Sequence, residues 1–201
     1  SKTDSFLLGK YVLDQILIFI FNTVLGLLSL ALLLRFYMQL INIPYHNPVS
    51  HFLVALTDFI VRPTSRFTPG YKGINLSTLL LAWLTQFILI AGIYKLQANN
   101  FSSDIATTTM ALMLLAFVEI IKTTFHIVMV AIIGQAVLSW FSPQNPMAPL
   151  LDSFTRPFLR IFRERVRPVG NIDLSPIFVL IIIQLLLMVT TGLQQDIYQL
   201  F

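Results

Sequence analysis

The residue types that carry enzyme chemistry are sparse in this chain. It has no cysteine, which excludes disulfides, thiolate nucleophiles and thiolate metal sites. His46 and His51 lie five residues apart and share no helical face with an acid, and His126 stands alone. An active site needs a nucleophile with a base, paired carboxylates or a metal cluster. Haem ligation needs histidines that face one another inside a bundle. We therefore expect no catalytic residue, no metal, no cofactor and no enzyme.

Glu119, Lys122 and His126 lie at helical spacing on one face of an otherwise apolar segment. An ionisable cluster inside a membrane is a functional hypothesis by default. With four spans, however, these residues fall near the outer surface, where water reaches them. Arg35 falls near the inner end of its own helix and can extend to that surface. The sequence therefore predicts no continuous chain of charges for protons or ions.

Gln86 and Gln184 are the polar residues at the middle of two apolar segments. Each lies twelve residues after the isoleucine of its motif, Ile74 or Ile172. At 1.5 Å per residue both amides lie roughly 14 Å deep, near mid-bilayer. An amide there needs a protein partner, so we predict that the two amides meet across helices. The alternative is a separate bond from each amide to nearby backbone carbonyls, and a transport path would instead leave both hydrated.

The composition is that of an integral membrane protein. Hydrophobic residues make up 56% of the chain and charged residues 11%, and the mean hydropathy is +0.80. A soluble domain carries roughly a quarter charged residues. The fold class that we expect is all-α and membrane-integral, with four transmembrane helices in two parallel repeats and two amphipathic helices on the cytoplasmic side.

Four segments are long and apolar enough to span, since a spanning helix needs about 20 residues. The third is too long for one span and too short for two. We place its span at residues 123–140, with residues 107–121 either turned into the outer interface or extending the helix, and residues 6–15 as their counterpart. The first span should be a retained helix and not a signal peptide. The segments are residues 16–41, 76–96, 105–141 (which contains the third span) and 176–193.

The two connections between paired spans, residues 47–67 and 145–167, have apolar residues at helical spacing. We predict interfacial helices with their apolar side in the membrane, although packing against the bundle explains the pattern equally well and both can hold. Each follows Asn-Pro, which suits an N-cap followed by proline at the first helical position. The apolar residues are Val49, Phe52, Leu53, Leu56, Phe59 and Ile60, and Leu150, Leu151, Phe154, Phe158, Ile161 and Phe162.

The basic residues gather in the same two connections, eight of them against three or four on the opposite side. The positive-inside rule then places both connections in the cytoplasm and both termini outside it. With two spans each, the repeats must be parallel. The eight are Arg62, Arg66, Lys72, Arg156, Arg160, Arg163, Arg165 and Arg167.

An internal repeat underlies this arrangement, with residues 1–98 as the first copy and residues 99–201 as the second. Arg-Pro-x-x-Arg occurs at residues 62–66 and again at 156–160. A glycine-to-serine motif then opens an apolar run at residues 73–77 and at 170–175.

These motifs resemble those of the YggT family, also called YlmG, over about residues 25–190. Residues 156–160, Pro168 and residues 170–176 match its cytoplasmic signature. The first copy departs from it, with Asn75 in place of aspartate and Thr78 in place of proline. Residues 33–39 look like the ending of the family's first helix, while residues 164–167 and the extended N-terminus depart from the family pattern.

The resemblance implies a small bacterial inner-membrane protein built from two helix pairs, with plastid relatives and no settled biochemical activity. It also implies a role in tolerance of osmotic stress, in cell division or nucleoid organisation, or in membrane-complex maturation, which in plastids includes haem attachment to a cytochrome b.

We therefore predict a multi-pass protein of the bacterial inner membrane that binds lipids or proteins as an assembly or organising factor. Its partners would be anionic lipids and other inner-membrane proteins. A homo-oligomer is compatible with the sequence, and no nucleic acid is predicted. The alternative is a transport or osmotic-response component with a polar path between the repeats, and the arginines can also serve topology alone. The predicted binding residues are Arg62, Arg66, Arg156, Arg160 and Arg163.

Overall fold

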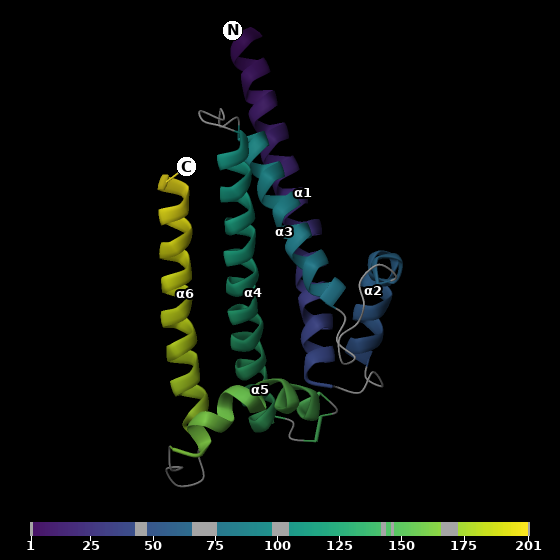
Figure 1. The fold of residues 1–201 in the computed structure, drawn as a ribbon, viewed down its shortest axis with the longest axis vertical. Coiled ribbons are helices and arrows are strands. Elements are labelled where there is room, and N and C mark those ends of the chain that lie inside the picture. Colours follow the sequence, from purple (N-terminus) through teal and green to yellow (C-terminus); the bar gives the residue numbers. More distant parts are fainter. Residues whose placement is uncertain are drawn as a thin grey trace.

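In the described part of the chain, four long helices run side by side, and two shorter helices join them in pairs (Figure 1). This computed structural model describes residues 2–42, 48–65, 76–97, 105–141, 144–145, 147–165 and 173–200, with side chains except at 2–10, 140, 141 and 200. All regular secondary structure among the described residues is helical, as predicted. The helices are α1 (Lys2–Leu40), α2 (Pro48–Thr64), α3 (Leu76–Leu96), α4 (Ile105–Phe141), α5 (Ala148–Arg163) and α6 (Ser175–Leu200).

The four long helices are apolar enough to cross a membrane, which confirms the four predicted spans. A helix satisfies its backbone hydrogen bonds internally, as the hydrocarbon core requires. The span-forming segments are Tyr11–Leu40, Leu76–Leu96, Ile105–Ser139 and Ser175–Gln199.

The third segment is one uninterrupted helix of 37 residues. Of the two interpretations of residues 107–121, the structure bears out the helix extension. At 1.5 Å per residue α4 is about 55 Å long, which exceeds a hydrocarbon core of about 30 Å. Helix α1, with 39 residues, is extended in the same way by the N-terminal stretch. Both helices must therefore tilt or project beyond the core.

The same order of long, short and long helix occurs in both halves of the chain. Helices α1 and α4 run toward the end of the bundle that carries α5, here called the connection end. Helices α3 and α6 run back to the opposite end, here called the termini end, where both N and C lie (Figure 1).

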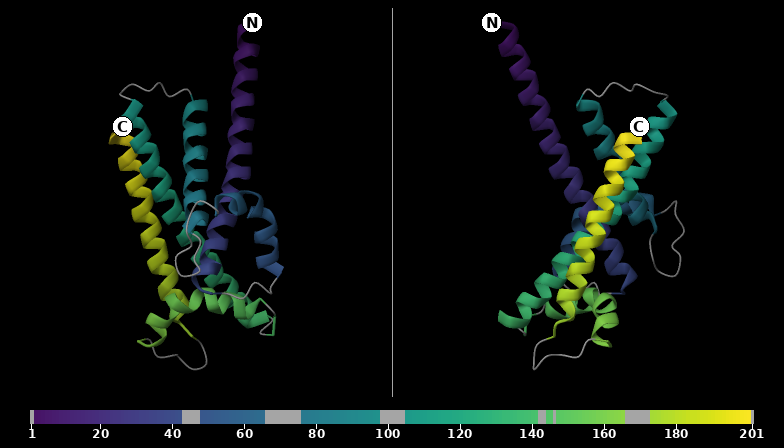
Figure 2. Two further views of the ribbon diagram at one scale, coloured as in Figure 1. Left: turned by 45° about the vertical axis from the view of Figure 1, so that its right-hand side comes forward. Right: turned by 90° about the vertical axis from the view of Figure 1, so that its left-hand side faces the viewer.

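The two short helices sit differently. Helix α5 lies across the connection ends of α4 and α6, whereas α2 stands beside α1 and α3 (Figure 2). The first described residue of α2 is Pro48, in keeping with the predicted start, and Asn47 lies outside the described residues. The predicted start of α5 is wrong by two residues. Asn145 does not cap the helix directly; its side chain accepts the Met147 N–H at 2.9 Å, and α5 begins at Ala148.

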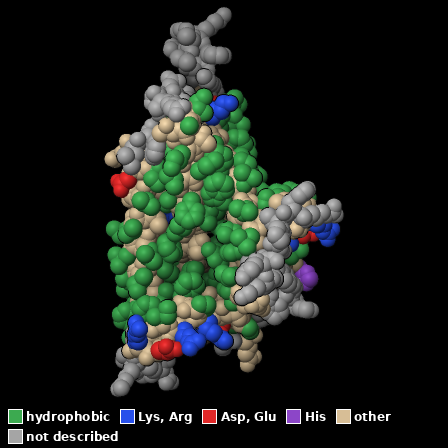
Figure 3. Space-filling model, in the orientation of Figure 1, with side chains coloured by type: hydrophobic (Ala, Val, Ile, Leu, Met, Phe, Trp, Pro, Cys, Tyr) green, Lys and Arg blue, Asp and Glu red, His purple; other side chains and the backbone are tan. Residues whose placement is uncertain are grey.

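Among the described residues, three apolar clusters hold the bundle together. The largest joins α1, α2, α3, α4 and α5 around Leu32, Leu33 and Leu53, so it links both halves. A second joins α4, α5 and α6 around Ile132, and a third joins α3, α4 and α6 around Leu115. On the outside, apolar side chains cover most of the height of the bundle, and charged side chains gather at the connection end (Figure 3). This surface is the kind that a lipid bilayer solvates.

Candidate functional site

Helix α5 carries most of the described predicted binding residues. Arg156 and Arg160 lie on its outer face, with their side chains 69% and 75% exposed. Phe158 and Ile161 are also exposed large apolar residues of α5. A helix that exposes both arginines and large apolar side chains suits the headgroup level of a membrane. The interfacial placement itself stays a prediction.

The arginines of α5 are already paired with carboxylates. Arg156 donates to Asp152 at 2.7 Å and Arg160 to Glu164 at 2.9 Å, each four residues away. The count of basic residues in the sequence could not show this, because it ignores neighbouring acids. Exposed ion pairs are weak in water. A lipid phosphate can therefore compete with these carboxylates for the guanidinium groups.

Arg163 has a structural partner that the sequence did not reveal. Its Nε donates to Asp173 at 2.8 Å, and the other carboxylate oxygen of Asp173 accepts the Ser175 N–H at 2.9 Å. Asp173 thus caps α6 and ties it to α5. Desolvation raises the pKa of Asp173, but hydrogen bonding from Ser175 and the charge of Arg163 outweigh it and hold the pKa below its ordinary value.

In the first half, Arg35 is a clamp between α1 and α2. It donates to Thr57 at 2.8 Å and to Asp58 at 3.2 Å, and its side chain is only 11% exposed. Asp58 also pairs with the exposed Arg62 at 3.3 Å. Arg66, another predicted binding residue, lies outside the described residues. Arg35 therefore binds α2, and its side chain does not extend freely to the surface as the sequence suggested.

The second half makes a similar contact between its first long helix and its short helix, with an amide in place of the guanidinium. Gln135 on α4 donates to Asp152 at 3.1 Å and accepts a hydrogen bond from Thr155 on α5. Asp58 and Asp152 each lie four residues before the arginine of an Arg-Pro pair. That shared spacing was the signal in the sequence that could have identified both aspartates.

The ionisable cluster of α4 divides in two. Gln194 on α6 donates to Glu119 at 2.6 Å and accepts from Lys122 at 3.0 Å, while Glu119 and Lys122 lie 3.9 Å apart. His126 instead faces the carbonyl of Lys122 on its own helix at 2.9 Å and is exposed. The first two residues thus hold α6 against α4, and His126 takes no part.

The structure does not bring Gln86 and Gln184 together, so that prediction is wrong. Gln184 is exposed, and its amide contacts the sulfur of Met129 at 3.2 Å. Gln86 is buried and lines a crevice with residues of α1 and α4, and its Oε1 has no hydrogen-bond partner. The two glutamines lie equally far from their motifs in the sequence but not at the same height in the bundle. The reason is that α3 begins farther from the connection end than α6 does (Figure 1).

Among the described residues, no group of three or more histidine, cysteine, aspartate or glutamate side chains is placed to hold a metal ion. The arrangement of the described charged groups serves to hold helices together and to display arginines, through the chemistry of ion pairs and hydrogen bonds.

Comparison with known proteins places these features in context. A family model described as CCB3/YggT matches residues 14–94 and, a second time, residues 114–194. An uncharacterized protein of Pseudomonas aeruginosa is 32% identical over 176 residues, 87% of each chain. The uncharacterized protein YggT of Escherichia coli (strain K12) is 28% identical over 180 residues, 89% of each chain. An uncharacterized protein of Haemophilus influenzae is 29% identical over 172 residues, 85% of this chain and 88% of its own. No solved structure matches significantly.

Proposed function

Because this chain belongs to the CCB3/YggT family and carries four helices able to span a membrane, we propose that it is a non-enzymatic protein of the bacterial inner membrane. It acts by binding, as an assembly or organising factor. Its binding surface is the outer face of α5, which meets the headgroups of anionic lipids and so positions the connection end for partner proteins.

The observation that carries this proposal is the composition of α5. Arg156 and Arg160 are exposed on one flank of the helix, and Phe158 and Ile161 are exposed elsewhere on the same helix. Apolar side chains enter the boundary between headgroups and acyl chains, and arginines bind phosphate with two parallel hydrogen bonds. Phosphate would replace Asp152 and Glu164 as the partner of the two guanidinium groups.

The connection end faces the cytoplasm in this proposal, and both termini lie outside. The concentration of arginine and lysine in the two connections supports this orientation through the positive-inside rule. The anionic lipids of the cytoplasmic leaflet then lie on the same side as α5.

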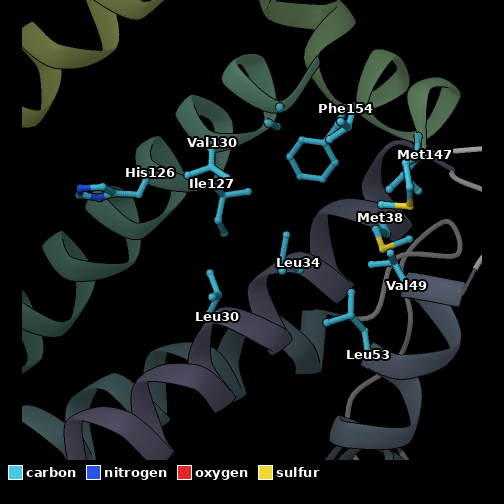
Figure 4. Close-up of a pocket in the computed structure, with 14 residues that line it drawn as sticks. Leu30, Leu34, Met38, Val49, Leu53, His126, Ile127, Val130, Met147 and Phe154 are labelled. Carbon is cyan, nitrogen blue, oxygen red and sulfur yellow. The ribbon is translucent and has the colours of Figure 1, made fainter. Parts of the chain in front are cut away.

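The space between the two halves favours binding over transport of a polar solute. In its described part, the half nearer the connection end is lined, apart from His126, by apolar residues that include Leu34, Met38 and Ile127 (Figure 4). A transport path for a polar solute needs polar groups or water along its whole length.

Spin-labelled lipids in nanodiscs test the proposal. The protein should retain labelled phosphatidylglycerol in preference to labelled phosphatidylcholine, and the preference should weaken as salt is raised. Arg156→Gln combined with Arg160→Gln should lower the preference severalfold, because two phosphate partners are lost.

Lys95→Gln is the matched control, since Lys95 is an exposed cation at the opposite end of the bundle. This change should leave the preference as it is. An equal preference in the double variant and the unaltered protein would contradict the proposal and would leave the arginines with a topological role alone.

A further inference from the structure

Helix α6 exposes two different faces. It stands at the edge of the bundle, packs against α4 and α5, and is the least buried of the four candidate spans in the described part of the chain (Figure 1). One exposed face is entirely apolar and suits lipid chains. The other, here called the mixed face, combines apolar with polar side chains. The apolar face is Phe178, Ile182, Leu185, Val189 and Leu193, and the mixed face is Ile177, Ile181, Gln184, Met188, Thr191 and Gln195.

The mixed face has the spacing of a helix-pairing surface. Its residues recur at alternating intervals of four and three, from Ile177 to Gln195. This is the heptad spacing with which two helices pack against each other along their length. At 1.5 Å per residue the face extends over about 27 Å, nearly the full depth of a hydrocarbon core of about 30 Å.

A groove of about 470 Å³ lies between the mixed face and α4. Gln184, Thr191 and Gln195 line it from α6, and Lys122 and His126 line it from α4. Figure 4 shows that His126 points away from the other labelled side chains, which lie between α1 and α4. The outer side of the α4–α6 pair is therefore hollowed and rich in hydrogen-bonding groups.

Gln184 has the greatest need of a partner on this face. It lies about 14 Å along α6 from Ser175, close to the middle of the hydrocarbon core. Its amide nitrogen contacts the sulfur of Met129, a weak acceptor, and its carbonyl oxygen has no partner among the described residues. At this depth no water is present to bind an exposed amide, so the missing partner must come from another molecule.

A second copy of this chain meets that need better than a lipid does. A lipid chain carries no hydrogen-bonding group at mid-bilayer depth. Two copies in one membrane have the same orientation, so the twofold axis between them runs along the membrane normal. Their α6 helices are then parallel, and each Gln184 meets its counterpart at the same height. An amide is both donor and acceptor, so two such side chains can bind each other.

The charges beside the mixed face do not oppose this pairing. Lys122 donates to Gln194 at 3.0 Å and lies 3.9 Å from Glu119. Two copies that meet along the mixed face therefore do not bring unpaired lysines together. The argument also holds whichever end of the bundle faces the cytoplasm, because it needs only the same orientation in both copies.

We propose that the mixed face of α6 is the interface of a homodimer. The two α6 helices run parallel along this face, and each Gln184 forms hydrogen bonds with the Gln184 of the other copy. Side chains of the second α6 enter the groove between α4 and the first α6.

Disulfide scanning along α6 tests where two copies meet. The chain has no cysteine, so each single cysteine reports on one position. In native membranes treated with a membrane-permeant oxidant, Ile181→Cys and Met188→Cys should form cross-linked dimers. Ile182→Cys and Val189→Cys lie at matched depths on the apolar face and should cross-link severalfold less, because a disulfide needs Cβ atoms within about 4.5 Å of each other.

Variants of Gln184 test the amide pair. The dimer dissociation constant can be measured by single-molecule photobleaching as the protein is diluted in liposomes. Gln184→Leu should raise this constant about tenfold, the effect of losing two average hydrogen bonds between membrane helices. Gln184→Asn keeps a donor and an acceptor and should retain part of the affinity. Leu185→Ala, on the apolar face, is the control and should leave the constant unchanged.

Each other outcome overturns the proposal. Equal cross-linking on the two faces would show random collision, and stronger cross-linking on the apolar face would place the interface there. A dissociation constant that is the same in Gln184→Leu and the unaltered protein would remove the amide pair. Cross-linking of Ile181→Cys to a different protein, without a dimer of this chain, would show that another partner covers the mixed face.

Discussion

At the scale of single residues, two aspartates organise the connection end. Asp58 joins Arg35 of α1 to Arg62, and Asp152 joins Gln135 of α4 to Arg156. Each carboxylate therefore fixes a short helix to a span and also holds the arginine of an Arg-Pro pair. The sequence showed the arginines as an excess of charge, and only the contacts show that they have acidic partners.

Removing the carboxylate of Asp58 should destabilise the protein. Arg35 is 11% exposed and its Nε already lacks a partner, so Asp58→Ala leaves a buried cation poorly compensated. We expect the free energy of unfolding to fall by about 1–3 kcal/mol, measured by denaturant unfolding in detergent micelles.

Glu164→Ala is the control, because its partner Arg160 is exposed, and it should have little effect. Arg35→Met combined with Asp58→Leu removes both charges and should be more stable than Asp58→Ala alone. If Asp58→Ala and Glu164→Ala lowered the free energy of unfolding equally, Asp58 would not have the proposed role of compensating the buried Arg35.

The cap of α6 should make stability depend on pH. The pKa of Asp173 is held below its ordinary value of 3.8. A lowered pKa means that the folded state binds the proton more weakly than the unfolded state. The carboxylate therefore stabilises the fold above pH 3.8, and this contribution is lost as the pH falls through the lower folded pKa.

Asp173→Asn keeps an acceptor for the Ser175 N–H but has no charge to titrate. Unfolding curves between pH 6 and pH 3 should therefore fall less steeply for this variant than for the unaltered protein. Curves that stay parallel over that range would show that Asp173 does not contribute in this way.

At the scale of elements, α2 packs on the bundle with a face that mixes polar and apolar residues, Ser50, Leu53, Thr57 and Val61. Ser50 and Thr57 are buried, whereas Phe52, Leu56 and Phe59 are exposed. Helical spacing alone predicted an apolar side, but it could not say which side packs on the bundle. The partner of Thr57 is Arg35, a residue of another helix, so the choice depends on tertiary contacts.

The exposed apolar side of α2 should contact lipid chains. Phe59→Trp, in a protein whose own Trp83 and Trp140 are replaced by phenylalanine, provides a fluorescent reporter at that position. Lipids brominated in their chains should quench it strongly, because an exposed phenylalanine beside spanning helices is solvated by hydrocarbon.

Glu164→Trp in the same background should be quenched little, since this exposed residue lies just beyond α5. Emission from Phe59→Trp that is unquenched and typical of water would place α2 outside the membrane.

At the scale of the whole molecule, hydropathy was sufficient to predict four spans and an all-helical fold. A spanning helix makes all its backbone hydrogen bonds within one segment, so the hydropathy of that segment alone is enough to predict it. The offset between α3 and α6 and the separation of Gln86 from Gln184 depend on how the helices pack. Those features arise from contacts between segments far apart in the chain, which periodicity and motif spacing do not report.

The two halves also meet in ways that the repeat did not predict. The hydroxyl groups of Tyr37 on α1 and Thr124 on α4 lie 2.8 Å apart and form a direct hydrogen bond between the two halves. The Tyr37 ring also packs edge-on against Phe154 of α5.

The central claim is that the arginine-bearing connection end faces the cytoplasm, and thiol labelling tests it most directly. The chain has no cysteine, so a single introduced cysteine gives an unambiguous signal. Gln97→Cys, at the termini end, should react with a membrane-impermeant maleimide in intact cells. Arg165→Cys, beyond α5, should react only after the cells are lysed. Labelling of Arg165→Cys in intact cells, with Gln97→Cys protected until lysis, would contradict the account.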